Sequence, residues 1–146
     1  MALAIIGALG MAVGMPWLFP SLGPTIAIQT TTPDAPAAQP WNVVVGHLLG
    51  LASGFAAVHV SGAVNMPSVA AAHALSLPRM LAAVFAVLLS MLLQASFKAS
   101  HPPAEATTLL IALGALEANG RNALIIALGV ALVTLIGQSA KPLFKP

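Results

Sequence analysis

The stretch 101–108, HPPAEATT, holds the densest group of chemically active side chains in an otherwise apolar chain. It contains a histidine, a carboxylate and two hydroxyls beside a pair of prolines, and strongly hydrophobic segments flank it on both sides. In a bilayer, an interrupted backbone must be buried in protein or line a wet cavity, because lipid cannot satisfy its N–H and C=O groups. The stretch therefore predicts either a helix-connecting turn at the membrane surface or part of a substrate site.

The two prolines predict where the following helix begins. A residue before proline avoids the α region, so Pro102 should be extended and Pro103 can be the first helical residue. The helix would then start with free N–H groups on Ala104 and Glu105, and such an end carries about half a positive charge that favours an anion. The candidate ligands for a small anion are His101, Pro102, Pro103, Ala104, Thr107 and Thr108, with His101 as a wall or proton partner. The alternative is a rigid surface turn around a buried His101.

A second proline break, PSLGPT at residues 20–25, offers the same chemistry. Pro24 would begin a helix, and its free donors would be the N–H groups of Gly23, Thr25 and Ile26, with the hydroxyls of Ser21 and Thr25 beside them. If the two helix starts face each other, two positive dipole ends converge and no Lys or Arg is needed in the membrane, where either costs at least ~2.5–3.5 kcal/mol. The alternative is a kinked helix end packed on its neighbour.

Composition indicates that the elements positioning these residues lie in a membrane. The chain has 146 residues, of which 59% are hydrophobic and 5% charged, whereas soluble domains carry about 25% charged residues. This length predicts a single domain over 1–146. There is no cysteine, and the four histidines are scattered, so neither a metal site nor a cofactor is expected. A net charge of +2 is too sparse for a nucleic-acid-binding face.

The apolar runs predict an all-α integral membrane protein with four transmembrane helices and two short, proline-interrupted helices that re-enter or cross as half-helices. The expected spans are residues 2–18, 43–60, 77–97 and 122–138, and the short helices are 25–31 and 104–116. Each half of the chain follows the order long helix, break, short helix, long helix. This order predicts two pseudo-repeats, about 1–60 and about 77–140, joined by a connector at 61–76. Paired interrupted segments are the best sequence pointer to a transport site.

Basic residues, which favour the cytoplasmic side, do not decide the orientation. If both short helices re-enter, the N-terminal side collects Arg79, Lys141 and Lys145 against Lys98 and Arg121. If both cross fully, Lys98 and Arg79 exchange sides, and the count is again three against two. We favour a cytoplasmic N-terminus and a bacterial inner membrane.

Gly46, Gly50 and Gly54 recur at every fourth residue of the second span. Such a face of small residues lets another backbone approach closely, either within the chain or between protomers. Four spans and two short helices are few to enclose a transport pathway. We therefore expect a homo-oligomer, with this glycine face as the first candidate contact between protomers.

Several titratable residues allow two interpretations each. His47 lies within a span, where an ionisable group is a functional candidate by default, although an interfacial, hydrogen-bonded histidine fits equally well. Glu105 is expected to cap its helix or face outward. Surface roles are expected for His59 and His73, and turn positions facing water for Asp34 and Glu117.

Three long motifs resemble the HPP family of integral membrane proteins, named for its His-Pro-Pro element. They are PWLFPSLGPT at 16–25, AQPWNVVVGHLLG at 38–50 and SHPPAEATTLLIALG at 100–114. The resemblance implies a helical protein with four spans and, through chloroplast and cyanobacterial members, nitrite transport. By motif position it implies substrate contacts for Ser21, Gly23, Pro24, Thr25, Asn42, His47, His101, Pro102, Pro103, Thr107 and Thr108. The chain departs from the pattern at Trp41, where many relatives have arginine, and at Glu105, where relatives have a small residue.

Two functions follow from these observations. The first is a transporter or channel for a small inorganic anion, nitrite-like by the resemblance, bound at the starts of the two interrupted helices. The second is a non-transporting accessory or assembly subunit that packs through the Gly46/Gly50/Gly54 face. An enzyme is not expected, because the sequence shows no metal cluster, activated nucleophile or paired carboxylates.

Overall fold

The computed structural model describes residues 1–144, and this part of the chain is helical without a β-strand. Lys145, which enters the count of basic residues, and Pro146 lie outside the described residues. The α-helices are α1 (Ala2–Val13), α2 (Leu22–Thr31), α3 (Pro40–Val60), α4 (Val69–Ala72), α5 (Leu77–Ser96), α6 (Ala104–Ala112) and α7 (Gly120–Ala140). Three short 3-10 turns complete the list: η1 (Pro36–Ala38), η2 (Ala63–Asn65) and η3 (Lys141–Phe144).

Three helices are long and apolar enough to cross a bilayer: α3 and α7 with 21 residues each and α5 with 20. At 1.5 Å per residue each spans about 30 Å, the thickness of the hydrocarbon core. The expected first span, 2–18, is too long, because α1 has only 12 residues. It ends where Gly14 adopts a left-handed conformation with φ of 67° and its N–H turns back to the last turn of the helix.

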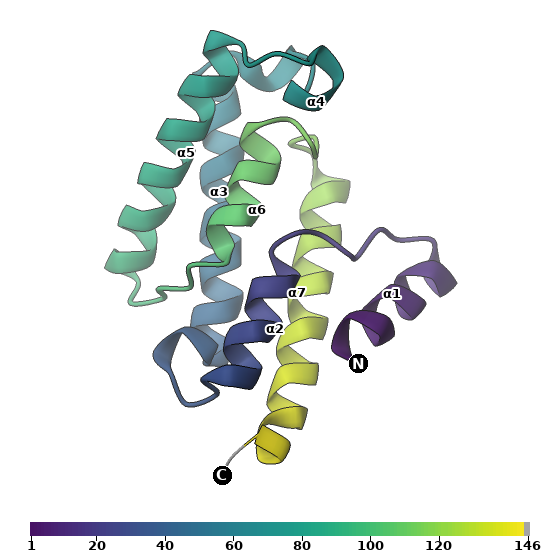
Figure 1. The fold of residues 1–146 in the computed structure, drawn as a ribbon. Helices are drawn as coiled ribbons and strands as arrows, with labels where there is room; N and C mark the ends of the chain where they lie inside the picture. The colour runs from purple at the N-terminus through teal and green to yellow at the C-terminus, as the bar shows by residue number, and fades with distance from the viewer. Residues whose placement is uncertain (145–146) are drawn as a thin grey trace.

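α3 is the central helix, and it packs against α5, α6 and α7. In Figure 1, α3 and α6 run upward whereas α5 and α7 run downward, so the segment between α5 and α7 joins opposite ends of the bundle. α2 lies along the lower half of α7, and α6 lies along the upper half of α3. Each short helix is therefore about half the height of its long neighbour, as an interrupted helix should be.

The glycine face of α3 is filled by the chain's own α6 and the segment before it. A Cβ at Gly50 would lie 2.6 Å from Thr108 Oγ1 and 2.9 Å from the Ala104 carbonyl oxygen, and one at Gly46 would lie 2.8 Å from His101 Cβ. A Cβ at Gly54 would meet the α6 backbone in the same way, 3.1 Å from the Thr108 carbonyl oxygen. The expectation that this face is the first candidate contact between protomers is thus wrong.

Both short helices differ from their predicted bounds. α2 begins at Leu22, so Pro24 is its third residue and does not begin it. α6 ends at Ala112, four residues early, because Gly114 has φ of 78° and reverses the chain there. The Gly114 N–H then donates to the Ile111 carbonyl over 2.9 Å, one of the hydrogen bonds that close such a helix end.

α5 lies at the edge of the bundle and exposes large apolar side chains along its length. Leu81, Val84, Leu88, Met91 and Leu92 are each about half or more exposed. A continuous apolar face of this kind is costly in water and suits contact with lipid.

Candidate functional site

The two proline breaks meet in the interior of the bundle. Ser21 Oγ lies 2.8 Å from Thr107 Oγ1, Thr25 Oγ1 lies 3.0 Å from His101 Nε2, and His47 Nε2 lies 3.2 Å from Ser21 Oγ. All five side chains are buried, although they come from α2, α3, α6 and the segment before α6. The Thr25 hydroxyl also donates to the Ser21 carbonyl over 2.8 Å. Five of the predicted site residues therefore form one hydrogen-bonded group, which we call the polar cluster.

Backbone carbonyls fix the orientation of both imidazoles in the cluster. His47 Nδ1 lies 2.8 Å from the Val43 carbonyl oxygen, and His101 Nδ1 lies 2.7 Å from the Ala37 carbonyl oxygen. A carbonyl only accepts, so each Nδ1 carries the hydrogen and Nε2 of the neutral ring carries a lone pair, which in His47 faces the Ser21 hydroxyl. The two ring centroids are 4.8 Å apart. Two imidazolium charges at this separation would repel strongly, so the pair holds at most one added proton.

Three of the five N–H groups that were expected to be free at the helix starts are bonded. The N–H of Ala104 donates to the His101 carbonyl over 2.9 Å, that of Glu105 to the Pro102 carbonyl over 3.1 Å, and that of Thr25 to the Ser21 carbonyl over 3.2 Å. Tight turns before each helix supply these acceptors. The two breaks thus contact each other through hydroxyl and imidazole groups.

The remaining predicted residues lie around the cluster without joining it. Asn42 Nδ2 donates to the Ser100 carbonyl over 3.0 Å and so ties the start of α3 to the segment before the His-Pro-Pro element. Thr108 Oγ1 donates to the Ala104 carbonyl over 3.2 Å and also lies 3.4 Å from Ser90 Oγ. Pro24 and Pro102 are exposed, Gly23 is half-buried, and Pro103 and Ala104 are buried. Pro24 and Pro102 thus shape the chain, and their exposed rings lie outside the buried cluster.

Glu105 belongs to a polar group that the sequence analysis missed. Its Oε1 accepts from Ser90 Oγ over 2.9 Å and from Gln94 Nε2 over 2.7 Å, and Gln94 Oε1 in turn accepts from the His101 N–H over 2.8 Å. The carboxylate therefore faces α5 and does not cap α6. Its Oε2 is buried without a partner, and Glu105 makes no ion pair with any described residue. The sequence signal for this group is the pair Ser90 and Gln94, two polar residues one turn apart in the apolar helix α5.

We expect Glu105→Gln to retain or raise thermal stability and Glu105→Leu to lower it. The amide carbonyl of glutamine still accepts from Ser90 and Gln94, and the substitution removes a charge from the apolar interior. Leucine removes the acceptor of the Ser90 hydroxyl and one of the two acceptors of Gln94 Nε2, which costs roughly 1–3 kcal/mol. Thermal unfolding in detergent measures both variants. Equal losses of stability in the two would contradict this account.

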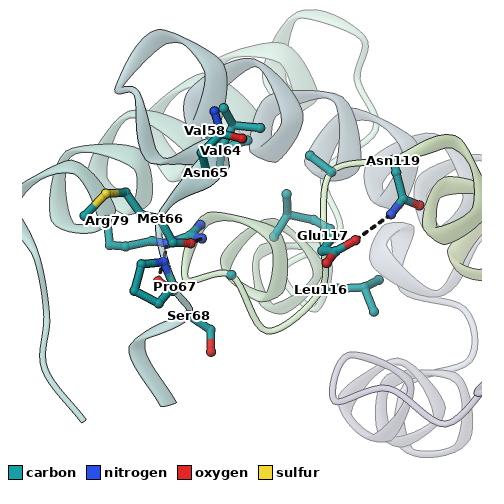
Figure 2. Close-up of a pocket in the computed structure, with 13 residues that line it drawn as sticks. Val58, Val64, Asn65, Met66, Pro67, Ser68, Arg79, Leu116, Glu117 and Asn119 are labelled. Atoms are coloured by element: carbon teal, nitrogen blue, oxygen red, sulfur yellow. Dashed lines mark hydrogen bonds between the residues drawn. The ribbon is translucent and has the colours of Figure 1, made fainter. Parts of the chain in front are cut away.

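The two pockets described in the structure lie away from the polar cluster. A cavity of about 780 Å³ is lined by residues from the α3–α5 connection, Arg79 and the α6–α7 connection, as Figure 2 shows. A smaller apolar one of about 220 Å³ lies between α1, α2 and α7. Within the described chain, no group of three or more His, Asp or Glu side chains could hold a metal ion. The cluster consists of hydroxyl and imidazole groups that bond to one another and to backbone carbonyls.

Comparison with known families decides what kind of protein carries this arrangement. A family model described as HPP, transmembrane region, matches residues 1–143. The chain belongs to the HPP transmembrane family. No curated relative and no solved structure matches it. Together with three helices of spanning length, membership makes this HPP protein an integral membrane protein.

Proposed function

We propose that this HPP protein carries a small inorganic anion, nitrite or one like it, across the membrane, and that the anion binds at the polar cluster. The observation that supports the proposal is the convergence of Ser21, Thr25, His47, His101 and Thr107 at the starts of two half-length helices. A fixed charge in the bilayer is energetically costly, whereas hydroxyls and helix dipoles can stabilise a negative solute there without one.

The cluster offers donors that can be redirected. The hydroxyls of Ser21 and Thr107 now bond to each other, and each can rotate its hydrogen toward an anion placed between them. Preorganised donors in a water-poor site stabilise a negative charge more strongly than the same donors in water.

Entry of the anion requires α2 to move away from α6. Side-chain hydrogen bonds from Ser21 and Thr25 hold the start of α2 to the other break, while α2 packs along α7. We infer that the protein also adopts an open form, in which α2 has moved away from α6 and the hydroxyls of the cluster can contact the anion.

We further propose that α6 with the segment before it crosses the membrane and does not return to the same side. α5 ends and α7 begins at opposite ends of the bundle (Figure 1), so the chain between them connects the two faces. Lys98, after α5, and Lys141, after α7, then share one face, and Arg79 and Arg121, at the starts of those helices, share the other. Non-helical backbone at this depth is tolerated because α3 buries it.

Flux of nitrite into liposomes containing the purified protein tests the proposed function. Thr107→Val keeps the shape of the side chain but removes the hydroxyl that faces Ser21. Loss of a hydrogen bond to a charged group costs roughly 1.5–3 kcal/mol, so we expect flux to fall about 10–100-fold. Thr31→Val is the matched control, because its exposed hydroxyl bonds only to the Ala27 carbonyl of its own helix. Equal flux in both variants would refute binding at the cluster.

The alternative of an accessory subunit loses its proposed contact, since α6 fills the Gly46/Gly50/Gly54 face. We retain assembly into a homo-oligomer, location in a bacterial inner membrane and the lack of enzymatic activity as parts of the proposal. The exposed apolar face of α5 is where a second copy could pack.

A further inference from the structure

The cavity of about 780 Å³ lies at one end of all three long helices. Its walls come from the end of α3, the connection 64–68, Arg79 near the start of α5 and the connection 114–119 before α7. Because α3 ends here while α5 and α7 begin here, this end of the bundle lies at the level of the lipid headgroups. The cavity is thus open to the polar surface layer of the membrane and is separate from the polar cluster.

Arg79 is the buried cation of this cavity. The residue is 5% exposed, and its guanidinium donates through Nε to the Pro67 carbonyl over 3.2 Å, through Nη1 to the Ala112 carbonyl over 3.1 Å, and through Nη2 to the Met66 carbonyl. Gly114 permits this position, because a Cβ there would lie 2.6 Å from Arg79 Cζ. The guanidinium is therefore held rigidly against the cavity wall.

The charge of Arg79 has no carboxylate partner within the described residues. The carbonyl end of α6 offsets part of the charge, since a helix carries about half a negative charge at its C-terminus. A guanidinium has five N–H groups, and the three bonds to carbonyls leave two without an assigned acceptor. A buried cation of this kind favours an anionic oxygen ligand, and its planar fork matches phosphate.

Glu117 supplies the opposite charge on the other side of the cavity. Both Arg79 and Glu117 line the cavity, and Figure 2 shows them on opposite sides of the view. Glu117 Oε2 accepts from Asn119 Nδ2 over 3.0 Å, so its Oε1 is left to accept from a donor in the cavity. The cavity thus offers one positive and one negative group to a single occupant.

We propose that this cavity binds the headgroup of an aminophospholipid, with the phosphate on Arg79 and the ammonium at Glu117. A volume of about 780 Å³ suits a ligand of many atoms and far exceeds the space that one small inorganic anion needs. Pockets with basic residues between transmembrane helices are known to hold lipid headgroups. The proposal does not depend on transport, since it concerns a different site.

Thermal unfolding of the detergent-purified protein with added short-chain lipids tests the proposal. Phosphatidylethanolamine should raise the unfolding temperature more than phosphatidylcholine, whose quaternary ammonium has no N–H to donate, and more than phosphatidylglycerol, which lacks the cation. Glu117→Gln should abolish the preference for phosphatidylethanolamine over phosphatidylglycerol and weaken phosphatidylethanolamine binding at least tenfold. Because Glu117 is exposed, we expect Glu117→Gln to fold. It therefore tests the proposal even if the corresponding variant of the buried cation, Arg79→Gln, does not fold.

Arg121→Gln is the control, since this exposed arginine lies at the same end of the bundle but does not line the cavity. Equal stabilisation by the three lipids would overturn the proposal, as would an unchanged preference in Glu117→Gln. Inorganic phosphate that stabilises the protein as strongly as phosphatidylethanolamine would also overturn it, because the ligand would then be a soluble anion. Binding of each lipid is counted independently by native mass spectrometry.

Discussion

Gly50→Ala is expected to destabilise the protein by roughly 1–3 kcal/mol, the usual range for overpacking a filled interior. The added methyl carbon would lie 2.6 Å from Thr108 Oγ1 and 2.9 Å from the Ala104 carbonyl oxygen. The hydroxyl could rotate away, but the carbonyl belongs to the first turn of α6, so the helix itself must move. Such movement displaces Thr107 from Ser21, and nitrite flux should fall together with the unfolding temperature.

Gly120→Ala is the matched control for this substitution. Nothing lies within 4 Å of a Cβ at Gly120, which is in the first turn of α7. Alanine is favoured over glycine in a helix by up to about 1 kcal/mol, so this variant should be as stable as the parent protein or slightly more stable. The experiment compares the two variants by thermal unfolding in one detergent. Similar unfolding temperatures would show that α6 does not pack closely on the glycine face of α3.

The membrane class and the positions of the two breaks could be predicted because they depend on local sequence. Low charge and long apolar runs predict spanning helices directly, and α5 follows its prediction at Leu77 and within one residue at its end. Proline is excluded from helices beyond their first turn, so the proline-rich segments before α2 and α6 could be predicted as breaks. The family resemblance agrees with the family match over nearly the whole chain. The pseudo-repeat of 1–60 and 77–140 stays a prediction.

Helix ends that depend on single glycines were predicted less well. Gly14 and Gly114 both adopt positive φ and end α1 and α6 early, although apolar residues continue beyond each. Hydrophobic pattern alone does not show which of the chain's 12 glycines takes that conformation.

Contacts between distant segments could not be predicted from residue types. Ser21 and Thr107 are 86 residues apart, and their hydrogen bond depends on how α2 and α6 both pack within the bundle. The same packing turned Glu105 toward Gln94 and placed α6 on the glycines of α3. The sequence therefore indicated the right residues for the polar cluster, while the hydroxyl and imidazole chemistry that joins them required the fold.

Anion flux is expected to rise as pH falls, and His101→Gln should abolish that rise. His101 Nδ1 donates to the Ala37 carbonyl, so the neutral ring presents a lone pair at Nε2, toward Thr25. A proton on Nε2 converts that acceptor into a donor and adds a positive charge beside the anion. Proton and anion then favour each other's binding equally, because linkage is reciprocal. One proton taken up per anion gives at most about a tenfold change in affinity per pH unit.

His59→Gln is the matched control. Like His101, His59 donates from Nδ1 to a backbone carbonyl, that of Phe55, but the His59 side chain is exposed. Flux is measured between about pH 5 and 8, with protein-free liposomes to subtract passage of the neutral acid. A pH dependence that persists in His101→Gln would contradict protonation of His101 and would indicate His47 as the proton acceptor instead. The His47 ring lies 4.8 Å from that of His101, and its Nε2 faces the Ser21 hydroxyl. If the pH dependence is lost in both His101→Gln and His59→Gln, the substitutions alter the fold and do not remove a specific proton site. Loss of the pH dependence in His101→Gln alone would show that the anion and one proton bind together. Their net charge is zero, and a neutral solute is the least costly to hold in a bilayer.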